Sequence, residues 1–515
     1  MNAVALALLL LAGAAQAAPP SPAAPPRAAP ASVPIVSTPV TIAAAPAAAP
    51  AAPQLAIVVQ DSTALRAAAR DSAQQQALLW QGDALEVRGQ RLDFLQVYDH
   101  RRERGGFVRA SSVRIVSTAP ENAAELLAVV RFLRDTSGAE ALGIAYAAAY
   151  LRAAPALAID AEPFDALGGM AERLARRATS NKNKANDALL AAHLDVAAAY
   201  GIAIRSFEHD GRMTLCYDGE AFRRVLALGG DAAQKARAAL ALTRPDCVDP
   251  DLTPAARVEL DTWRADVLER APRANLPEFV KNRLRLRSAA VWSSIAFERA
   301  RRGQPAAEAA NRAIDELAAV NKQELGEDDQ TAYNDAAARV GASRWAAEPA
   351  RTQTPAGLTV VAAAGQPGET CLKLVDKTHD ESKPLFQRCT FGVAWLNSAR
   401  SNTQGSAVAL AVQPLDTWRE LWVFHIGANG WTVDVLTPSD DAGEAGYLEF
   451  AGFVPGTNKL LAAREVRAAG KFTRSFEVLD LETLAVLKHA DNPEALSVFY
   501  RWQDPAWKKQ TVSLR

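Results

Sequence analysis

"QGDALEVRGQRLDFLQVYDHRRERGGFVRASSVR", residues 81–114, alternates short apolar runs with polar turns and carries two adjacent glycines after a basic run. Strand-like segments at this spacing predict a small antiparallel β fold. Further strand-like runs at 55–59 and 77–80 extend the pattern over residues 54–116. These short strands favour a small β-barrel, because closing a sheet removes its unpaired edges.

Four short motifs in this region follow the order found in one domain family. They are Leu65-Arg66-Ala67, then Gly82-Asp83 before Leu85-Glu86-Val87, then Phe94-Leu95-Gln96-Val97, and finally Gly105-Gly106-Phe107-Val108 with Val113. Their order and spacing resemble a bacterial SH3-like (SH3b) domain, and the resemblance is confined to residues 54–116. The chain departs from the family pattern at Phe94 and Phe107, where Trp is common.

The resemblance implies a binding role for this region, with a peptide, a cell-wall segment or a partner protein as ligand. The candidate ligand-binding rings are Trp80, Phe94, Tyr98 and Phe107, because amphipathic rings give contact area at a low entropy cost. The alternative is that these rings only close the ends of the barrel. The basic residues Arg101 and Arg102 are either a solvated hairpin tip or an anion site.

The resemblance also gives an expectation for the two glycines. Gly105 and Gly106 are expected to adopt positive φ and to allow close backbone approach where the hairpin re-enters the barrel. Val108 and Val113 are expected to point inward on either side of a short helical turn.

The first residues indicate export. An apolar run from Ala3 to Ala12 and the segment Ala15-Gln16-Ala17 fit a signal peptide over residues 1–17, although no Lys or Arg precedes the run. Residues 18–53 are almost all Ala and Pro, which predicts a disordered linker. We therefore expect a periplasmic or secreted protein without a transmembrane segment after signal cleavage.

Length and charge restrict the function classes further. The chain has 515 residues and a formal net charge of −1, so we expect several domains and no nucleic-acid partner.

Four cysteines agree with an oxidising compartment. Four cysteines permit three connectivities, and the sequence separations favour Cys216 with Cys247 and Cys371 with Cys389. The alternative for Cys216 is a catalytic thiol paired with His209.

Residues 120–348 predict an array of helical hairpins, because apolar residues recur three and four positions apart in Ala-rich segments. In the first segment Leu126, Val130 and Leu133 share one face, and Val129 and Phe132 border it. A polar break is expected around residues 209–212. No sustained repeat of tetratricopeptide length is found.

After a linker at 349–357, residues 358–515 alternate β-branched and aromatic residues and predict a β-rich domain. Residues 385–490 weakly resemble propeller blades, but too few blades fit for a closed propeller, so an open sheet on the helices or a sandwich is an equal alternative. Most of the tryptophans here are expected in the core: Trp395, Trp418, Trp422, Trp431, Trp502 and Trp507.

The sequence contains none of the motifs whose spacing carries a known mechanism, so we assign no catalytic residue, metal ligand or cofactor. The favoured hypothesis is a non-catalytic binding or scaffold protein of the cell envelope. The alternative is a cell-wall hydrolase with an unrecognised active site and the SH3-like module as its targeting arm. A third alternative is a purely structural protein.

Overall fold

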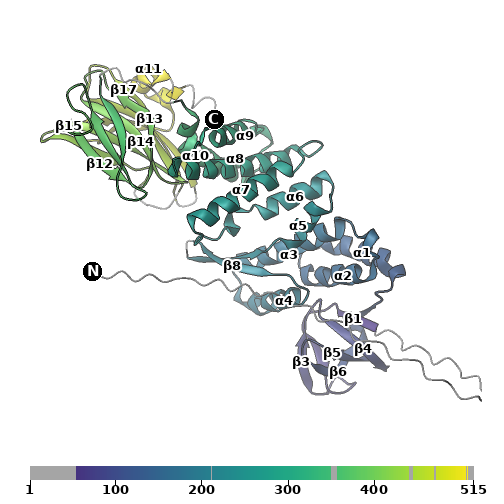
Figure 1. The fold of residues 1–515 in the computed structure, drawn as a ribbon. Helices are drawn as coiled ribbons and strands as arrows, with labels where there is room; N and C mark the ends of the chain where they lie inside the picture. Colours follow the sequence, from purple (N-terminus) through teal and green to yellow (C-terminus); the bar gives the residue numbers. More distant parts are fainter. Residues whose placement is uncertain are drawn as a thin grey trace, which may run out of the picture. The chain divides into compact units, whose positions relative to one another are not determined.

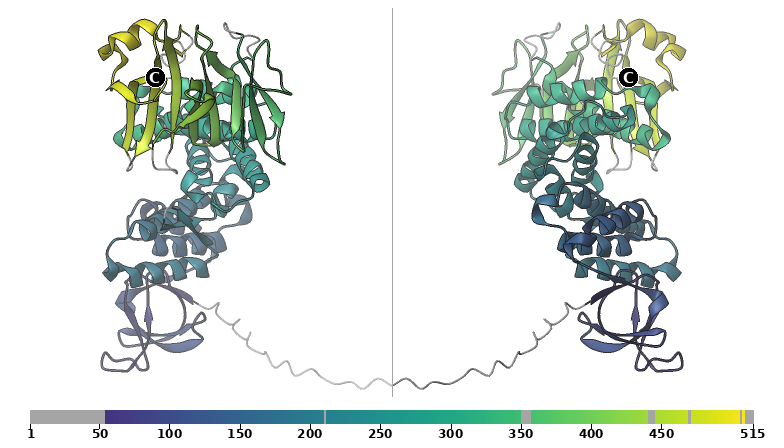
Figure 2. Two further views of the ribbon diagram at one scale, coloured as in Figure 1. Left: turned by 90° about the vertical axis from the view of Figure 1, so that its left-hand side faces the viewer. Right: turned by 90° about the vertical axis from the view of Figure 1, so that its right-hand side faces the viewer.

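The computed structural model describes residues 54–209, 211–349, 357–439, 445–468, 471–505 and 507–508. The predicted signal peptide, the linker at 18–53 and most of the linker at 349–357 lie outside these residues. Along the described chain a β-rich region is followed by a helical region and then by a second β-rich region (Figures 1 and 2). This order confirms the coarse fold class that the sequence predicts.

The N-terminal region is an antiparallel sheet with the strand order β3-β2-β6-β5-β4-β1-β7. Its pairings do not join β3 to β7, so within the described residues the sheet is open and the expected closed barrel is not formed. β2 and β6 share a single register pair, Arg66 with Phe107, which leaves the sheet weakly joined at this point. The strands are β1 (Gln54–Val58), β2 (Thr63–Arg66), β3 (Gln75–Leu79), β4 (Ala84–Arg91), β5 (Phe94–Asp99), β6 (Arg104–Arg109) and β7 (Val113–Val116).

Alternate residues of these strands form one apolar core. Val108 and Val113 are both buried, on either side of the 3-10 turn Ala110–Ser112, which confirms the sequence prediction. Around them pack the apolar residues Ala56, Val58, Leu65, Leu79, Leu85, Leu95 and Val97.

Strand β1 is buried on both of its faces. Ala56 and Val58 point into the sheet core, whereas Ile57 belongs to the apolar cluster of the first helices. All three side chains are fully buried. The continuous apolar run at this strand follows from that double burial, because a strand with one solvated face would alternate with polar residues.

The two glycines of β6 have different roles from the one expected. Neither has positive φ, so this part of the prediction is wrong. A Cβ on Gly106 would lie 2.8 Å from both the Arg66 carbonyl oxygen and the Leu65 side chain, which confirms the close approach. A Cβ on Gly105 would lie 3.6 Å from the Tyr98 ring and 3.7 Å from the Val97 carbonyl oxygen, which are ordinary van der Waals contacts.

The helical region consists of packed hairpins. Its helices are α1 (Ala123–Arg134), α2 (Glu140–Ala153), α3 (Glu162–Ser180), α4 (Asp187–Ala199), α5 (Glu220–Ala227), α6 (Ala232–Leu242), α7 (Pro254–Arg270), α8 (Glu278–Arg301), α9 (Ala307–Ala318) and α10 (Glu327–Ser343). Leu126, Val130 and Leu133 of α1 are buried as predicted, but Phe132 is 73% exposed and does not border the core. None of the described helices combines the length and apolarity needed to cross a membrane.

A β-hairpin interrupts the helices where a polar break was expected. It consists of β8 (Ile204–His209) and β9 (Arg212–Tyr217), which pair antiparallel. Cys216 of β9 is bonded to Cys247, which ends the 3-10 turn Pro245–Cys247, with 5.7 Å between the Cα atoms. The disulfide thus joins the segments that flank the α5–α6 hairpin, as the sequence predicts.

The C-terminal region contains two sheets. One has the order β10-β11-β12, and the other has the order β13-β14-β15-β17-β18-β19-β20 with β16 paired to β15. Cys371 of β11 and Cys389 of β12 are direct register partners and form the second predicted disulfide. The strands are β10 (Thr359–Ala364), β11 (Thr370–Val375), β12 (Phe386–Thr390), β13 (Val393–Ser401), β14 (Ala407–Leu415), β15 (Trp418–Gly427), β16 (Gly430–Leu436), β17 (Gly446–Val454), β18 (Lys459–Ala468), β19 (Lys471–Asp480) and β20 (Val486–Ala490), followed by α11 (Ser497–Trp502).

Four of the six C-terminal tryptophans are buried as expected, namely Trp395, Trp418, Trp422 and Trp507. Trp431 is half-buried and Trp502 is 39% exposed. The described strands from β13 to β20 belong to one sheet rather than to separate blades. The propeller resemblance itself stays a prediction.

Buried charges join α10 and the segment after it to the second sheet. The guanidinium of Arg344 donates to Glu449 of β17, with 2.7 Å from Nε to Oε1, and Arg419 of β15 lies 3.2 Å from the same carboxylate. Arg419 also donates to the Gly341 carbonyl at 2.6 Å. Because Arg419 is fully buried, this pairing compensates a charge that would otherwise be costly to bury.

The glycine pair of β6 gives a matched stability test. Gly106→Ala is expected to lower the free energy of unfolding of the N-terminal sheet by about 1 to 3 kcal/mol, because backbone and core atoms must move. Gly105→Ala is expected to change it by less than about 0.5 kcal/mol. Urea denaturation measures both. Equal effects of the two substitutions would contradict this account of Gly106.

The first disulfide gives a second test. Replacing Cys216 and Cys247 together by serine is expected to lower the free energy of unfolding by about 3 to 4 kcal/mol, because the bond closes a long loop in the unfolded chain. Circular dichroism during urea denaturation follows the helices. The double variant Cys371→Ser with Cys389→Ser is the control and should leave the helical transition in place; an unshifted transition in the first variant would contradict the prediction.

Candidate functional site

Tyr98 and Phe107 lie on the outer face of the N-terminal sheet, opposite its core. Tyr98 of β5 pairs with Gly105 of β6, and Phe107 pairs with Gln96. Both aromatic side chains are half-buried. Since Gly105 has no side chain, the edge of the Tyr98 ring next to β6 stays uncovered, and the two rings can present one aromatic surface.

Arg88 reaches this surface through a β-bulge. Val87 pairs with Val97 and Gly89 pairs with Gln96, so Arg88 is the extra residue between them. A bulge redirects the side chain that it carries. The guanidinium carbon of Arg88 lies 4.0 Å from the centroid of the Tyr98 ring, a cation–π contact.

Two further polar residues complete the outer face. Glu86 accepts a hydrogen bond from Arg88 at 3.1 Å and lies 2.6 Å from Nε2 of His100. The hydrogen bond from Arg88, followed by that from His100, lowers the pKa of the Glu86 carboxyl. The His100 ring packs edge-on against Tyr98 at 4.9 Å between centroids. The outer face is defined here as Glu86, Arg88, Tyr98, His100 and Phe107.

Of the other two candidate rings, Phe94 shares a face of β5 with Tyr98 but is buried, and Trp80 follows β3. Phe94 is 3% exposed and lies beneath the guanidinium of Arg109, so its ring offers little area to a ligand. Trp80 is half-buried and precedes the turn of Gly82 and Asp83, which faces the helices. There the Tyr200 hydroxyl donates to the Gly82 carbonyl at 2.7 Å.

Asp61 also joins the sheet to the helices. Its Oδ1 lies 2.8 Å from Nε2 of the buried His193 of α4 and accepts the backbone N–H of Gln81. Burial alone would raise the pKa of Asp61, but the hydrogen bonds from His193 and Gln81 outweigh it and lower the pKa.

Arg101 and Arg102 bind groups of the protein itself. Arg102 donates to Asp99 at 2.7 Å and to Asp83 at 3.0 Å. Arg101 lies 3.3 Å from Asp83 and donates to the carbonyl of Asp195 of α4 at 3.1 Å. Since Asp83 and Asp99 are both buried, the two arginines compensate buried carboxylates and hold the hairpin against the helices.

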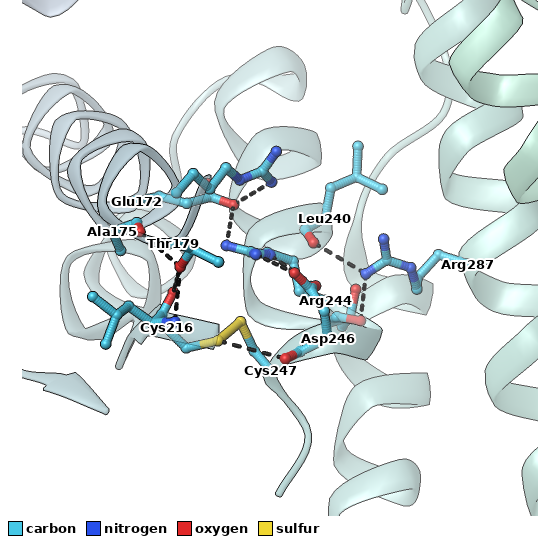
Figure 3. The surroundings of a disulfide bond; sticks show 12 residues. Glu172, Ala175, Thr179, Cys216, Leu240, Arg244, Asp246, Cys247 and Arg287 are labelled. Atoms are coloured by element: carbon cyan, nitrogen blue, oxygen red, sulfur yellow. Dashed lines mark hydrogen bonds and ion pairs between the residues drawn. A yellow bond between two sulfur atoms is a disulfide. The ribbon is translucent and has the colours of Figure 1, made fainter. Parts of the chain in front are cut away.

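The surroundings of the first disulfide hold a cluster of paired charges (Figure 3). Arg244 is 8% exposed; it donates to Asp246 and, at 3.4 Å, to Glu172. Arg287 donates to the carbonyls of Leu240 and Thr243. Burial would raise the pKa of Asp246, but the Arg244 guanidinium lowers it further than burial raises it. These charges stabilise the fold around the disulfide.

Near the second disulfide, the Glu369 carboxylate lies close to the sulfurs of Cys371 and Cys389. Both sulfurs are in the disulfide and cannot act as thiolate ligands. This group therefore supports no metal site. The alternative of a catalytic thiol at Cys216 is excluded in the same way, because its sulfur is bonded to Cys247.

A cavity of about 600 Å³ lies between α10, the strands β18 and β19, and the C-terminal segment around α11. It is larger than the cavity of about 210 Å³ beside the first disulfide. Its wall contains the buried residues Tyr333, Glu465, Phe476 and Trp507. Charged and amide side chains surround them: Lys322, Gln330, Asn334, Arg474, Asp491, Asn492, Glu494, Gln503 and Lys508.

Glu465 is the buried carboxyl of this cavity. It is 8% exposed and accepts a hydrogen bond from the Tyr447 hydroxyl at 2.8 Å. Burial raises its pKa to about 7, against the opposing charge of Arg474. A carboxyl in this state can donate as well as accept a hydrogen bond near neutral pH.

Comparison of the chain with protein-family models, curated proteins and solved structures gave no match.

The sequence analysis proposed Tyr98 and Phe107 as candidate rings but did not include Glu86, Arg88 or His100 around them. Glu86 and Tyr98 are direct partners across β4 and β5, so the alternation of β4 would have placed Glu86 on the outer face. The bulge at Arg88 has no sequence signal of its own. The cavity was also missed, because its wall combines three segments that are distant in sequence.

The raised pKa of Glu465 predicts a pH dependence of stability. The folded chain holds this proton up to about pH 7, whereas the unfolded carboxyl releases it near 4.5. The contribution of the protonated carboxyl to the free energy of unfolding is therefore fully present below about pH 4.5 and is lost as the pH rises through about 7. This contribution is about 3 kcal/mol. Urea denaturation of the wild type and Glu465→Gln across this range measures the difference.

Glu494→Gln, which alters a carboxyl on the rim of the same cavity, is the control and should keep the pH dependence of the wild type. A pH profile that Glu465→Gln leaves unchanged would contradict the prediction.

Proposed function

We propose that the protein is an exported binding protein of the cell envelope, and that its N-terminal SH3-like sheet holds a peptide on the outer face. The peptide belongs to the cell wall or to a partner protein. The observation that carries the proposal is the pair of half-buried rings Tyr98 and Phe107 on the outer face, where Gly105 puts no side chain beside Tyr98, while other parts of the same sheet bind the helices.

The chemistry of the outer face suits an extended peptide. Aromatic rings supply apolar contact area, and Arg88 and Glu86 beside them can pair with the carbonyl, amide or charged groups of a peptide. The side chains are also held in place before a ligand arrives, since Arg88 stacks on Tyr98 and Glu86 bonds both Arg88 and His100. Such preorganisation lowers the entropy cost of binding.

The fixed position of the sheet favours a binding or scaffold protein over an enzyme with a loose targeting arm. Asp61, Gly82 and Arg101 bond to groups of the helical region, and Ile57 is part of its apolar cluster. A ligand on the outer face would therefore be held at a constant distance from the helices. Export is supported by the two disulfides, which form in oxidising compartments.

Retention of the full chain on purified sacculi tests the proposal. Tyr98→Ala combined with Phe107→Ala is expected to reduce retention by about tenfold or more, because central aromatic contacts dominate binding at such surfaces. Ile115→Ala is the matched control, since Ile115 is a 52% exposed apolar residue on β7 of the same sheet.

Three outcomes decide between the hypotheses. Loss of retention in the aromatic variant alone supports the proposal. Equal retention of the wild type and both variants, or no retention of any of them, contradicts it. Release of soluble muropeptides by the full chain would instead support the alternative of a cell-wall hydrolase.

A further inference from the structure

We propose that the cavity between α10, β18–β19 and the C-terminal segment is a second binding site, which takes a short peptide by its free carboxylate. The cavity of about 600 Å³ has the size of pockets that enclose small ligands. Unlike the outer face of the N-terminal sheet, it is concave and has a buried polar floor. The site is independent of the peptide surface proposed above.

Within the part of the chain that the structure describes, the wall of the cavity includes a hydrogen-bond donor without an acceptor. Trp507 is 4% exposed, and its indole Nε1–H has no hydrogen-bond partner within the described chain. A buried indole N–H usually has an acceptor, and leaving it unpaired is unfavourable. A ligand oxygen in the cavity would supply the missing acceptor.

Three cations line the cavity without an ion pair shorter than 4.0 Å to any described residue. Among the described residues, Lys322, Arg474 and Lys508 make no ion pair within 4.0 Å, although most arginines of the helical region do. Each of them lies instead over an aromatic ring of the cavity: Lys322 over Tyr333 at 5.2 Å, Arg474 over Phe476 at 5.7 Å and Lys508 over Tyr500 at 5.5 Å. These three cations and the indole N–H can together bind an anionic ligand group, beside the carboxyls that also line the cavity.

The other residues that line the cavity suit a peptide better than a small inorganic anion. Four amide side chains, Gln330, Asn334, Asn492 and Gln503, can pair with the amide groups of a peptide backbone. The rim carboxylates Asp491 and Glu494 can accept a peptide ammonium or N–H. A small inorganic anion would use the cations but neither of these groups.

Glu465 determines how binding depends on pH. Among the described residues, the titratable and charged groups that contact it or line the cavity with it are Tyr447 on β17, Arg474 on β19, and Lys322, Tyr333, Tyr500, Lys508, Asp491 and Glu494 around the cavity. In its protonated form Glu465 can donate to the ligand carboxylate, whereas its ionised form repels it. Since burial raises its pKa to about 7, affinity is expected to fall as the pH rises from 6 to 8.

Isothermal titration calorimetry of the full chain at pH 6 tests the proposal with two probes, tetra-alanine and its C-terminal amide. The free carboxylate is expected to bind at least about tenfold more tightly than the amide. Trp507→Phe is expected to weaken binding of tetra-alanine by about tenfold. Glu465→Gln should bind at pH 6 and lose the fall in affinity between pH 6 and 8.

Trp502→Phe is the matched control, because Trp502 is a partly exposed indole of α11 that does not line the cavity. If Trp507→Phe loses its near-ultraviolet circular dichroism, Lys508→Ala replaces it as the exposed test position. Equal affinity for the acid and the amide, or competition by inorganic phosphate at the same concentration as tetra-alanine, would overturn the proposal. Tyr98→Ala with Phe107→Ala should leave tetra-alanine binding unchanged, which separates the two sites.

Discussion

Strand β1 belongs to two hydrophobic cores, and the position of the N-terminal sheet depends on it. Its alternate residues Ala56 and Val58 fill the core of the sheet, whereas Ile57 between them packs with the first helices. With all three side chains fully buried, the sheet cannot rotate on the helices without exposing apolar surface. Asp61, Gly82 and Arg101 add polar contacts around this strand and fix the same orientation.

The fixed orientation of the N-terminal sheet gives different surroundings to the candidate binding residues, which the sequence alone does not distinguish. Trp80, Arg101 and Arg102 lie near the helices or bind buried carboxylates, and Phe94 lies beneath Arg109. Tyr98 and Phe107 are on the outer face, where Gly105 leaves space beside the Tyr98 ring. The pair of glycines therefore has two roles, since Gly106 allows the strand to pack and Gly105 keeps the aromatic surface open. The proposed binding surface consists of the two candidate rings that remain, because the other candidate residues are buried or make contacts within the protein.

Local patterns predicted local structure well. The strand alternation identified Val108 and Val113 as core residues, and the short separations identified both disulfides. Prediction was less successful where the decisive contact joins distant segments. The β8–β9 hairpin, the bulge at Arg88 and the cavity around Trp507 depend on pairings and packing that no single window contains. The positive φ expected at Gly105 and Gly106 was wrong, because the strand pairing holds both in extended backbone.

If a peptide of the cell wall binds the outer face of the N-terminal sheet, the solvent access of Tyr98 and Phe107 should fall on binding. Hydroxyl-radical footprinting of the full chain, free and bound to purified sacculi, reports the solvent access of individual side chains. The account predicts that Tyr98 and Phe107 are oxidised less when the chain is bound, while Ile115 on the same sheet is oxidised to the same extent in both states. Unchanged oxidation of Tyr98 and Phe107 in the retained protein would contradict it.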